Sequence, residues 1–363
     1  MNENDFQNIG TKKNKKIYAF NIILIIAIFI AIFTYIISVE GLDNIRNLLQ
    51  RANYWWVLLG LFCLVCMWIA EAITIHFPLK KLYPNQKIGN SFKITMIGQL
   101  FNNITPFASG GQLMQSYIMY REGKRPSNTL SVLTMRFVIT QSILIIFTII
   151  VVLSQFNFFA NIFKDLVWLG IIGILVNILL VAVFLLAGIN KNFIMKISKP
   201  FISLGSKIHI GNFTLVKNKE KTIENFEASV TNYSNQFKNM HKEKGTVAIM
   251  IIFGFIQSIL YYAITYAVYR TFGNFGATFL QIITTQAFLM LLMSIFPTPG
   301  AGLGAEGGFL LLFSSIFQNG TINLSILFWR IYVFYLPIII GALFFIPSFR
   351  RAKKEIANEE IKL

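Results

Sequence analysis

The sequence predicts an all-α polytopic membrane protein with six spanning helices and two re-entrant broken hairpins, arranged as an inverted repeat. The composition is far too apolar for a soluble domain, because 55% of the 363 residues are hydrophobic and only 13% are charged. Several charge-poor runs reach the roughly 20 residues that an α-helix needs to cross a bilayer. Two segments rich in proline and glycine interrupt this pattern, at 105–111 and 297–308.

Six charge-poor runs predict membrane spans, at 17–37, 54–75, 129–153, 166–186, 246–269 and 324–346. The first run is too long for a signal peptide and no small-residue cleavage site follows it, so we expect an uncleaved helix. Lysines and arginines precede the first and third runs and follow the second, fourth and sixth. The positive-inside rule then places both termini in the cytoplasm.

The charge pattern divides the chain into a basic cytoplasmic N-terminus (1–16), an integral membrane domain (17–349) and a basic cytoplasmic tail (350–363). The membrane domain contains a first half (54–188), a cytoplasmic connector (189–245) and a second half (246–346). The connector carries an apolar stripe at helical spacing: Ile223, Phe226, Val230, Tyr233, Phe237 and Met240. The stripe predicts a helix lying on the bundle or the lipid surface, with a short dimerising coiled coil as the alternative.

Each broken segment is followed by one arginine in an apolar run. Arg136 comes 30 residues after Pro106, and Arg330 comes 31 residues after Pro299. The first segment begins and ends among cytoplasmic charges, whereas the second lies between runs that end and start outside. We therefore expect hairpins that enter from opposite faces, with eight plain crossings as the alternative. The residues expected to break the helices are Pro106, Gly110, Gly111, Pro297, Pro299, Gly300, Gly307 and Gly308.

Four ionisable side chains fall at membrane depth: Glu71, Arg136, Glu306 and Arg330. Each costs about 2.5 to 3.5 kcal/mol there, so such groups normally face a cavity or one another. A guanidinium matches a phosphodiester, which makes the two arginines candidate phosphate ligands with Glu306 as their counter-charge. The alternative is a pair of buried ion pairs that only stabilise the fold. For Glu71 the repeat offers no partner, since Ile264 stands at the corresponding offset.

Polar side chains beside the first break complete the candidate site. Gln112 and Asn103 are expected either to bind a lipid head group or to cap the broken helix ends. Short helices beginning after Gly111 or Gly308 would direct free N–H groups toward an anion. The sequence contains neither a catalytic motif nor a plausible set of metal ligands, so we expect no catalytic residue, metal or cofactor.

These residues carry a resemblance to a known family. At Pro106 with Gly110-Gly111, at Arg136, and at 297–300 followed by Glu306-Gly307-Gly308, the chain resembles the flippase-like membrane domain of the lysylphosphatidylglycerol synthases, the multiple peptide resistance factor family. The resemblance covers about 17–349. Full-length members add a soluble domain that uses lysyl-tRNA. Because the chain stops at Leu363, fourteen residues beyond that region, we expect a stand-alone form.

The resemblance implies a flippase or lipid-handling transporter for aminoacylated or anionic phospholipid in the bacterial plasma membrane, linked to resistance against cationic antimicrobial peptides. The alternatives are a phosphatidylglycerol lysyltransferase and a non-transporting scaffold. The expected partner is membrane phospholipid, and a separate soluble aminoacyl-lipid synthase and a second copy of the chain are further candidates. Direct nucleic-acid binding is not expected despite the net charge of +17, because the basic residues cluster between apolar runs.

Overall fold

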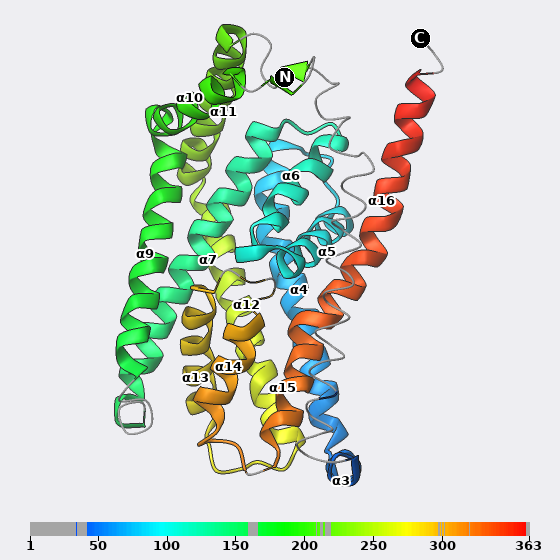
Figure 1. Ribbon diagram of the computed structural model, residues 1–363, viewed down its shortest axis with the longest axis vertical. Coiled ribbons are helices and arrows are strands. Elements are labelled where there is room, and N and C mark those ends of the chain that lie inside the picture. The colour runs from blue at the N-terminus through cyan, green and yellow to red at the C-terminus, as the bar shows by residue number, and fades with distance from the viewer. Residues whose placement is uncertain are drawn as a thin grey trace.

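The computed structural model describes residues 34, 42–158, 166–207, 209–210, 213–214, 219–296, 298, 300, 302–318 and 320–360. Apart from residue 34, the predicted span 17–37 lies outside the described residues, as do Pro297 and Pro299. The described chain is predominantly helical (Figure 1). It also contains a small antiparallel hairpin of β1 (His209–Ile210) and β2 (Phe213–Thr214) in the connector.

Five helical segments are long and apolar enough to cross a membrane. They are α4 (Tyr54–Leu82), α7 (Pro126–Ser154), α9 (Val167–Ile189), α12 (Lys244–Thr271) and Ile322–Ser348, which joins α15 (Ile322–Arg330), the π-helical turn η5 (Ile331–Tyr335) and α16 (Leu336–Glu360). These helices coincide with five of the six predicted runs. Their outward faces expose large apolar side chains, for example Trp168 at 73% and Leu179 at 64%, as expected for lipid contact.

The same order of elements occurs twice. The first set is α4, α5 (Ile88–Ile104), the short 3-10 turn η2 (Pro106–Ala108), α6 (Gly110–Arg121) and α7. The second set is α12, α13 (Phe279–Met293), a break that includes Gly300, α14 (Gly302–Phe313) and the segment that starts with α15. The short helices contain 12 to 17 residues and are about 18 to 26 Å long, less than the ~30 Å hydrocarbon core.

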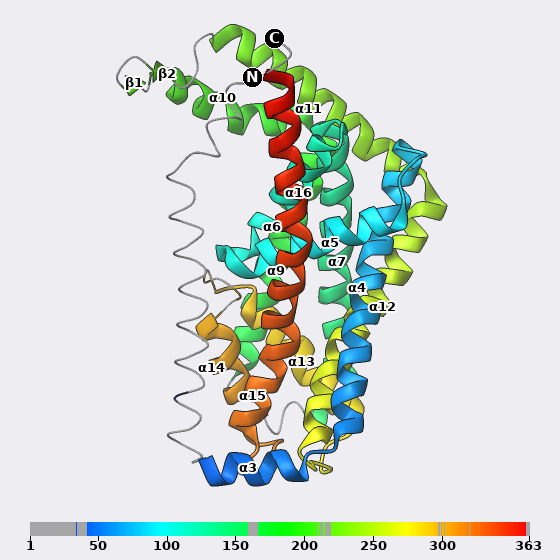
Figure 2. The same ribbon diagram turned by 90° about the vertical axis from the view of Figure 1, so that its right-hand side faces the viewer.

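The two sets run in opposite directions. In Figures 1 and 2, α5 and α6 lie in the half of the bundle near α10 and α11, whereas α13 and α14 lie in the half near α3 (Leu42–Arg51). α4 begins beside α3 and α12 begins beside α11, so these two long helices are antiparallel. The two sets of short helices therefore lie towards opposite ends of the bundle.

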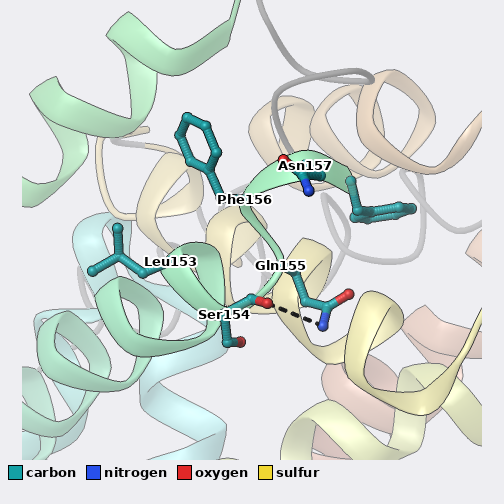
Figure 3. A pocket seen from close by; sticks show the side chains of 6 residues that line it. Leu153, Ser154, Gln155, Phe156 and Asn157 are labelled. Atoms are coloured by element: carbon teal, nitrogen blue, oxygen red, sulfur yellow. Dashed lines mark hydrogen bonds between the residues drawn. The ribbon is translucent and has the colours of Figure 1, made fainter.

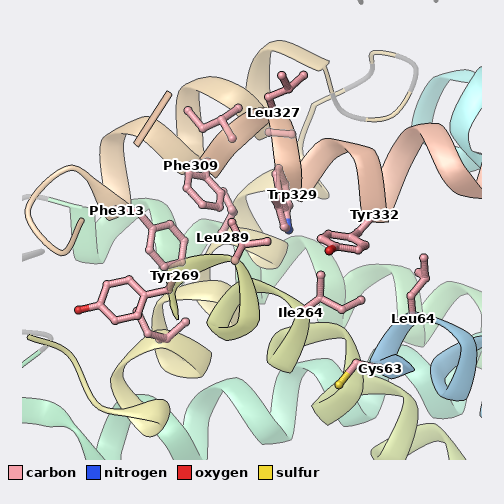
Figure 4. Close-up of a cluster of buried hydrophobic side chains, with 14 of the residues drawn as sticks. Cys63, Leu64, Ile264, Tyr269, Leu289, Phe309, Phe313, Leu327, Trp329 and Tyr332 are labelled. Carbon is pink, nitrogen blue, oxygen red and sulfur yellow. The ribbon is translucent and has the colours of Figure 1, made fainter. Parts of the chain in front are cut away.

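The two halves share an apolar core. α4 packs along α12, and the side chains of Leu64, Ile264, Phe309 and Trp329 converge between α4, α12, α14 and α15 (Figure 4). The hydroxyl of Tyr332 in η5 donates a hydrogen bond of 2.8 Å to the carbonyl oxygen of Val57 in α4. This contact ties the second broken set directly to the first spanning helix of the other half.

The connector folds onto the bundle. It consists of α10 (Lys191–Lys207), the β hairpin and α11 (Lys219–Lys242). The predicted stripe lies on α11, where Val230, Phe237 and Met240 are buried and the Tyr233 hydroxyl donates to Thr134 Oγ1 of α7 at 3.1 Å. The stripe therefore packs inside the chain, as the bundle-surface interpretation expects, rather than being free for a coiled coil.

Candidate functional site

Glu71 in α4 lies at the centre of a buried polar cluster. Its side chain is 1% exposed. One carboxylate oxygen accepts a hydrogen bond from Nη2 of Arg136 in α7, and the other accepts one from Nε2 of Gln99 in α5 at 2.5 Å. The partner comes from another spanning helix of the same half, and the comparison of the two halves, in which Ile264 stands at the offset of Glu71, does not reveal it.

Arg136 is only partly satisfied by these contacts. Its Nε is buried and has no hydrogen-bond partner among the described residues. The side chain as a whole is 14% exposed, so it is not completely buried. A guanidinium carries five N–H donors, and a buried donor without an acceptor costs free energy. The cluster thus contains a cation that retains donors for an additional acceptor.

Arg330 at the end of α15 instead has a hydrogen-bond partner at each of its three guanidinium nitrogens. Its Nε donates to Oε1 of Glu306 in α14 at 2.6 Å. Its Nη1 and Nη2 donate to the carbonyl oxygens of Gly300 and Gly302, at 3.0 and 3.2 Å. The side chain is 3% exposed, against 23% for Glu306. Every guanidinium nitrogen of Arg330 therefore contacts the second broken segment, which this arginine holds in place.

The two arginines differ because the repeat is not chemically symmetric. Glu306 precedes Arg330 by 24 residues, and Gln112 precedes Arg136 by the same 24 residues. The half-buried Gln112 in α6 thus stands where the second half has its carboxylate. In the first half the neutralising charge comes from Glu71 on a spanning helix instead. The two arginines occupy equivalent places, but only one of them has its counter-charge on the hairpin.

The first break is a strained turn whose backbone groups are satisfied locally. Phe107 and Ala108 have φ angles of 54° and 51°, in the left-handed region that residues with a Cβ rarely adopt. The Thr105 hydroxyl accepts a hydrogen bond from the Gly110 N–H at 2.8 Å and donates one to the Phe101 carbonyl at 2.6 Å. One side chain thus bridges the end of α5 and the start of α6.

Four of the glycines expected to break the helices lie inside helices instead. Gly110 and Gly111 lie in the first turn of α6, and Gly307 and Gly308 lie within α14. Of the expected breaking residues that the structure describes, Pro106 starts η2 and Gly300, with φ of 58°, lies in the second break. The break in the chain is therefore narrower than the glycine-rich segments.

Close helix packing explains two of these glycines. A Cβ on Gly111 would collide with the Asn102 side chain and lie 2.7 Å from the Gly98 carbonyl oxygen of α5. A Cβ on Gly308 would lie 2.6 Å from Leu289 Cδ1 of α13. Small residues at such contacts let backbones approach each other. Asn103, a candidate head-group ligand, donates to the Gln99 carbonyl of its own helix at 2.9 Å.

Two surface hollows lie apart from both ion pairs. One, of about 380 Å³, lies at the end of α7 and is lined by the uncharged residues Leu153, Ser154, Gln155, Phe156, Asn157 and Phe158 (Figure 3). The other, of about 390 Å³, lies near the start of α7 and is lined by Tyr83, Asn85, Gln86, Lys87, Asn90, Glu122 and Lys124. Neither of these two hollows is lined by Arg136 or Arg330.

Glu122 in the second hollow has an altered acidity. Burial alone would raise its pKa, but hydrogen bonds from Lys124, Lys93 and Asn90 outweigh that effect and hold the pKa below its ordinary value. Both lysine nitrogens lie 2.6 Å from its carboxylate oxygens. The described residues contain no group of three or more His, Cys, Asp or Glu side chains placed to hold a metal ion.

A comparison with protein families identifies the chain. A family model described as the lysylphosphatidylglycerol synthase TM region matches residues 22–341. The chain belongs to this family. The match includes the first half, the connector, the second half up to residue 341 and the ion pairs of Arg136 and Arg330, which confirms the resemblance seen in the sequence. No curated protein matches the chain. Together with the five apolar helices, membership of the family assigns the chain to the multi-pass membrane proteins with a lipid-related function.

Proposed function

We propose that the protein is a flippase or lipid-handling transporter that moves an anionic or aminoacylated phospholipid, such as lysylphosphatidylglycerol, between the leaflets of a bacterial plasma membrane. Both termini lie in the cytoplasm in this proposal, following the distribution of lysine and arginine. The observation that carries it is the incomplete satisfaction of Arg136, which retains a buried Nε–H donor. A separate soluble synthase would supply an aminoacylated cargo.

Arg136 would bind the lipid phosphate. A phosphodiester presents two unesterified oxygens, and a guanidinium can donate to both in one plane. Glu71 neutralises Arg136 while no lipid is bound, which avoids an isolated buried charge. When the phosphate replaces Glu71 as the partner of Arg136, the released Glu71 carboxylate can bind the ammonium group of a lysyl head group. The pair thus offers complementary sites to a head group that carries both charges.

The two broken hairpins would provide the path. Each pair of short helices would enter the membrane from its own face and return, so that the irregular backbone lies where protein and head groups can satisfy it. Arg330 fixes the second break through two carbonyl oxygens, whereas the first break has no such clamp to Arg136. We therefore assign the movement that exposes Arg136 to the first hairpin. Export of a cationic lipid would weaken attraction of cationic peptides to the outer surface.

A leaflet-accessibility assay tests the proposal. The purified protein is reconstituted into vesicles with fluorescent phosphatidylglycerol or its lysyl derivative, and transbilayer movement is followed by chemical quenching of the outer leaflet. Arg136→Gln should abolish the protein-dependent movement, and Arg136→Lys should restore little, since a point charge lacks the planar fork. Lys87→Gln, which removes an exposed cation, is the matched control. Wild-type movement in well-folded Arg136→Gln protein would refute the proposal.

A further inference from the structure

Arg270, at the end of α12, lies in a cage of aromatic rings. Its guanidinium carbon is 5.0 Å from the centroid of the Trp56 ring, 5.8 Å from that of Tyr266 and 4.2 Å from that of Phe275. Trp56 and Tyr266 also pack edge to face, with centroids 5.7 Å apart. The rings therefore form a mutually supported enclosure that holds the cation in position.

The cage leaves most donors of Arg270 unused. Nη1 donates to the Tyr266 hydroxyl at 3.2 Å, while Nε is buried and has no partner among the described residues. No carboxylate of the described residues forms an ion pair with Arg270. Aromatic rings attract a cation through their quadrupole, but they offer no oxygen to its in-plane N–H groups. The missing element of this site is an oxygen anion.

The position of the cage suggests which anion fits. The cage lies at the end of the bundle opposite α10 and α11, where α3 lies across the helix ends (Figure 2). The backbone N–H of Asn53, just before α4, donates to the Thr271 carbonyl at 2.9 Å and ties α4 to the residue after Arg270. Trp55, which precedes Trp56 in the sequence, is 81% exposed, and tryptophan is enriched at the level of lipid head groups.

The charge of this end agrees with an anionic ligand. α3 exposes Arg46 and Arg51 against a single described acid, Asp43. Helices with one apolar face and exposed cations lie in the head-group layer, where anionic lipids attract them. Arg270 adds a third cation, whose Nε has no acceptor among the described residues. A phospholipid phosphate at this depth would supply the missing oxygens.

We propose that Arg270 and its aromatic cage bind the phosphate of a phospholipid head group at the outer end of the bundle, as a second lipid site distinct from the Arg136 cluster. The cage holds the guanidinium in place at this end of the bundle. Binding there needs neither transport nor an occupied Arg136, so the site can be tested when the proposed flippase activity is absent.

Isothermal titration of dioctanoylphosphatidylglycerol into the protein in detergent micelles measures this site. All variants carry Arg136→Gln, which removes the other proposed phosphate ligand. Arg270→Gln should weaken binding about tenfold or more, and Arg270→Lys should give an intermediate loss. Arg51→Gln, which removes an exposed cation at the same end, should change the affinity less than about twofold. Thermal unfolding verifies folding, and Arg270→Lys decides the result if the glutamine variant does not fold.

Two further ligands identify what the site recognises. Dioctanoylglycerol, which has the same acyl chains without phosphate, should bind equally to the Arg136→Gln protein with and without Arg270→Gln. Inorganic phosphate should bind far more weakly than the lipid. Unchanged phosphatidylglycerol binding in both Arg270 variants, or an equal loss in Arg51→Gln, would overturn the site. Arg270-dependent binding of inorganic phosphate as tight as that of the lipid would show that free phosphate is the ligand and overturn the lipid assignment.

Discussion

Replacing Arg330 with glutamine removes three contacts at once. The variant loses the bond to Glu306 and leaves the carbonyl oxygens of Gly300 and Gly302 without their donors. Breaking a buried ion pair by removing one partner costs about 3 to 5 kcal/mol. Glu306 is 23% exposed and recovers part of its hydration, which favours the lower end of that range. We expect the free energy of unfolding to fall by about 3 kcal/mol.

Companion variants divide this loss into its parts. Glu306→Gln/Arg330→Gln removes the uncompensated carboxylate, so it should recover about 1 to 2 kcal/mol relative to Arg330→Gln. Arg330→Lys can keep the ion pair but cannot reach both carbonyl oxygens. Its free energy of unfolding should therefore lie between those of Arg330→Gln and the double variant. Unfolding by sodium dodecyl sulfate in mixed micelles measures all three. A loss below about 0.5 kcal/mol in Arg330→Gln would show that Arg330 does not hold the second break.

The other predictions concern packing, strain and acidity. Gly111→Ala should lower the free energy of unfolding by about 1 to 3 kcal/mol, because the new Cβ meets the Gly98 carbonyl oxygen. Gly307→Ala is its control, since no atom lies within 4 Å of that Cβ, and equal losses in both variants would contradict the packing explanation. Ala108→Gly should raise the melting temperature, because the left-handed backbone at Ala108 costs about 1 kcal/mol that a glycine does not incur. A decrease would show that the turn is unstrained. The lowered pKa of Glu122 stabilises the fold above the ordinary carboxyl value of 4.5, and this contribution is lost as the pH falls through the folded pKa. Melting temperatures measured down to pH ~3 should therefore fall less steeply in Glu122→Gln than in the wild type, and parallel curves would exclude the effect.

Hydropathy predicts the spanning helices well because it is a local property. The runs at 54–75, 129–153, 166–186, 246–269 and 324–346 each lie within a described helical segment or overlap it almost completely. The pairing of the buried charges is not local. Glu71 and Arg136 are 65 residues apart, and comparing the two halves directs attention to Ile264 rather than to Arg136. Gln99 is an amide in a largely apolar stretch, which is a usable but weak sign of a buried polar cluster.

Glycines in these segments have two different structural roles, which the sequence alone does not distinguish. Gly300 supplies a left-handed backbone, whereas Gly111 supplies room for a neighbouring helix. The left-handed residues of the first break, Phe107 and Ala108, have no sequence sign at all, because neither is a residue type that favours that conformation. The sequence gives no sign of the Arg270 site either, because a cation at the end of a spanning helix is common. Only the surrounding rings distinguish it.

α11 gives the connector a mechanical role. The Ser234 hydroxyl donates to the Gly188 carbonyl at 2.9 Å, and the Phe237 ring packs where a side chain on Gly188 would stand, so α11 is attached to the last spanning helix of the first half. Only residue 243 separates α11 from α12, and Glu243 pairs with Lys81 at the end of α4 at 3.2 Å. The connector therefore attaches the start of α12 to α9 and to the end of α4 over a short length of chain.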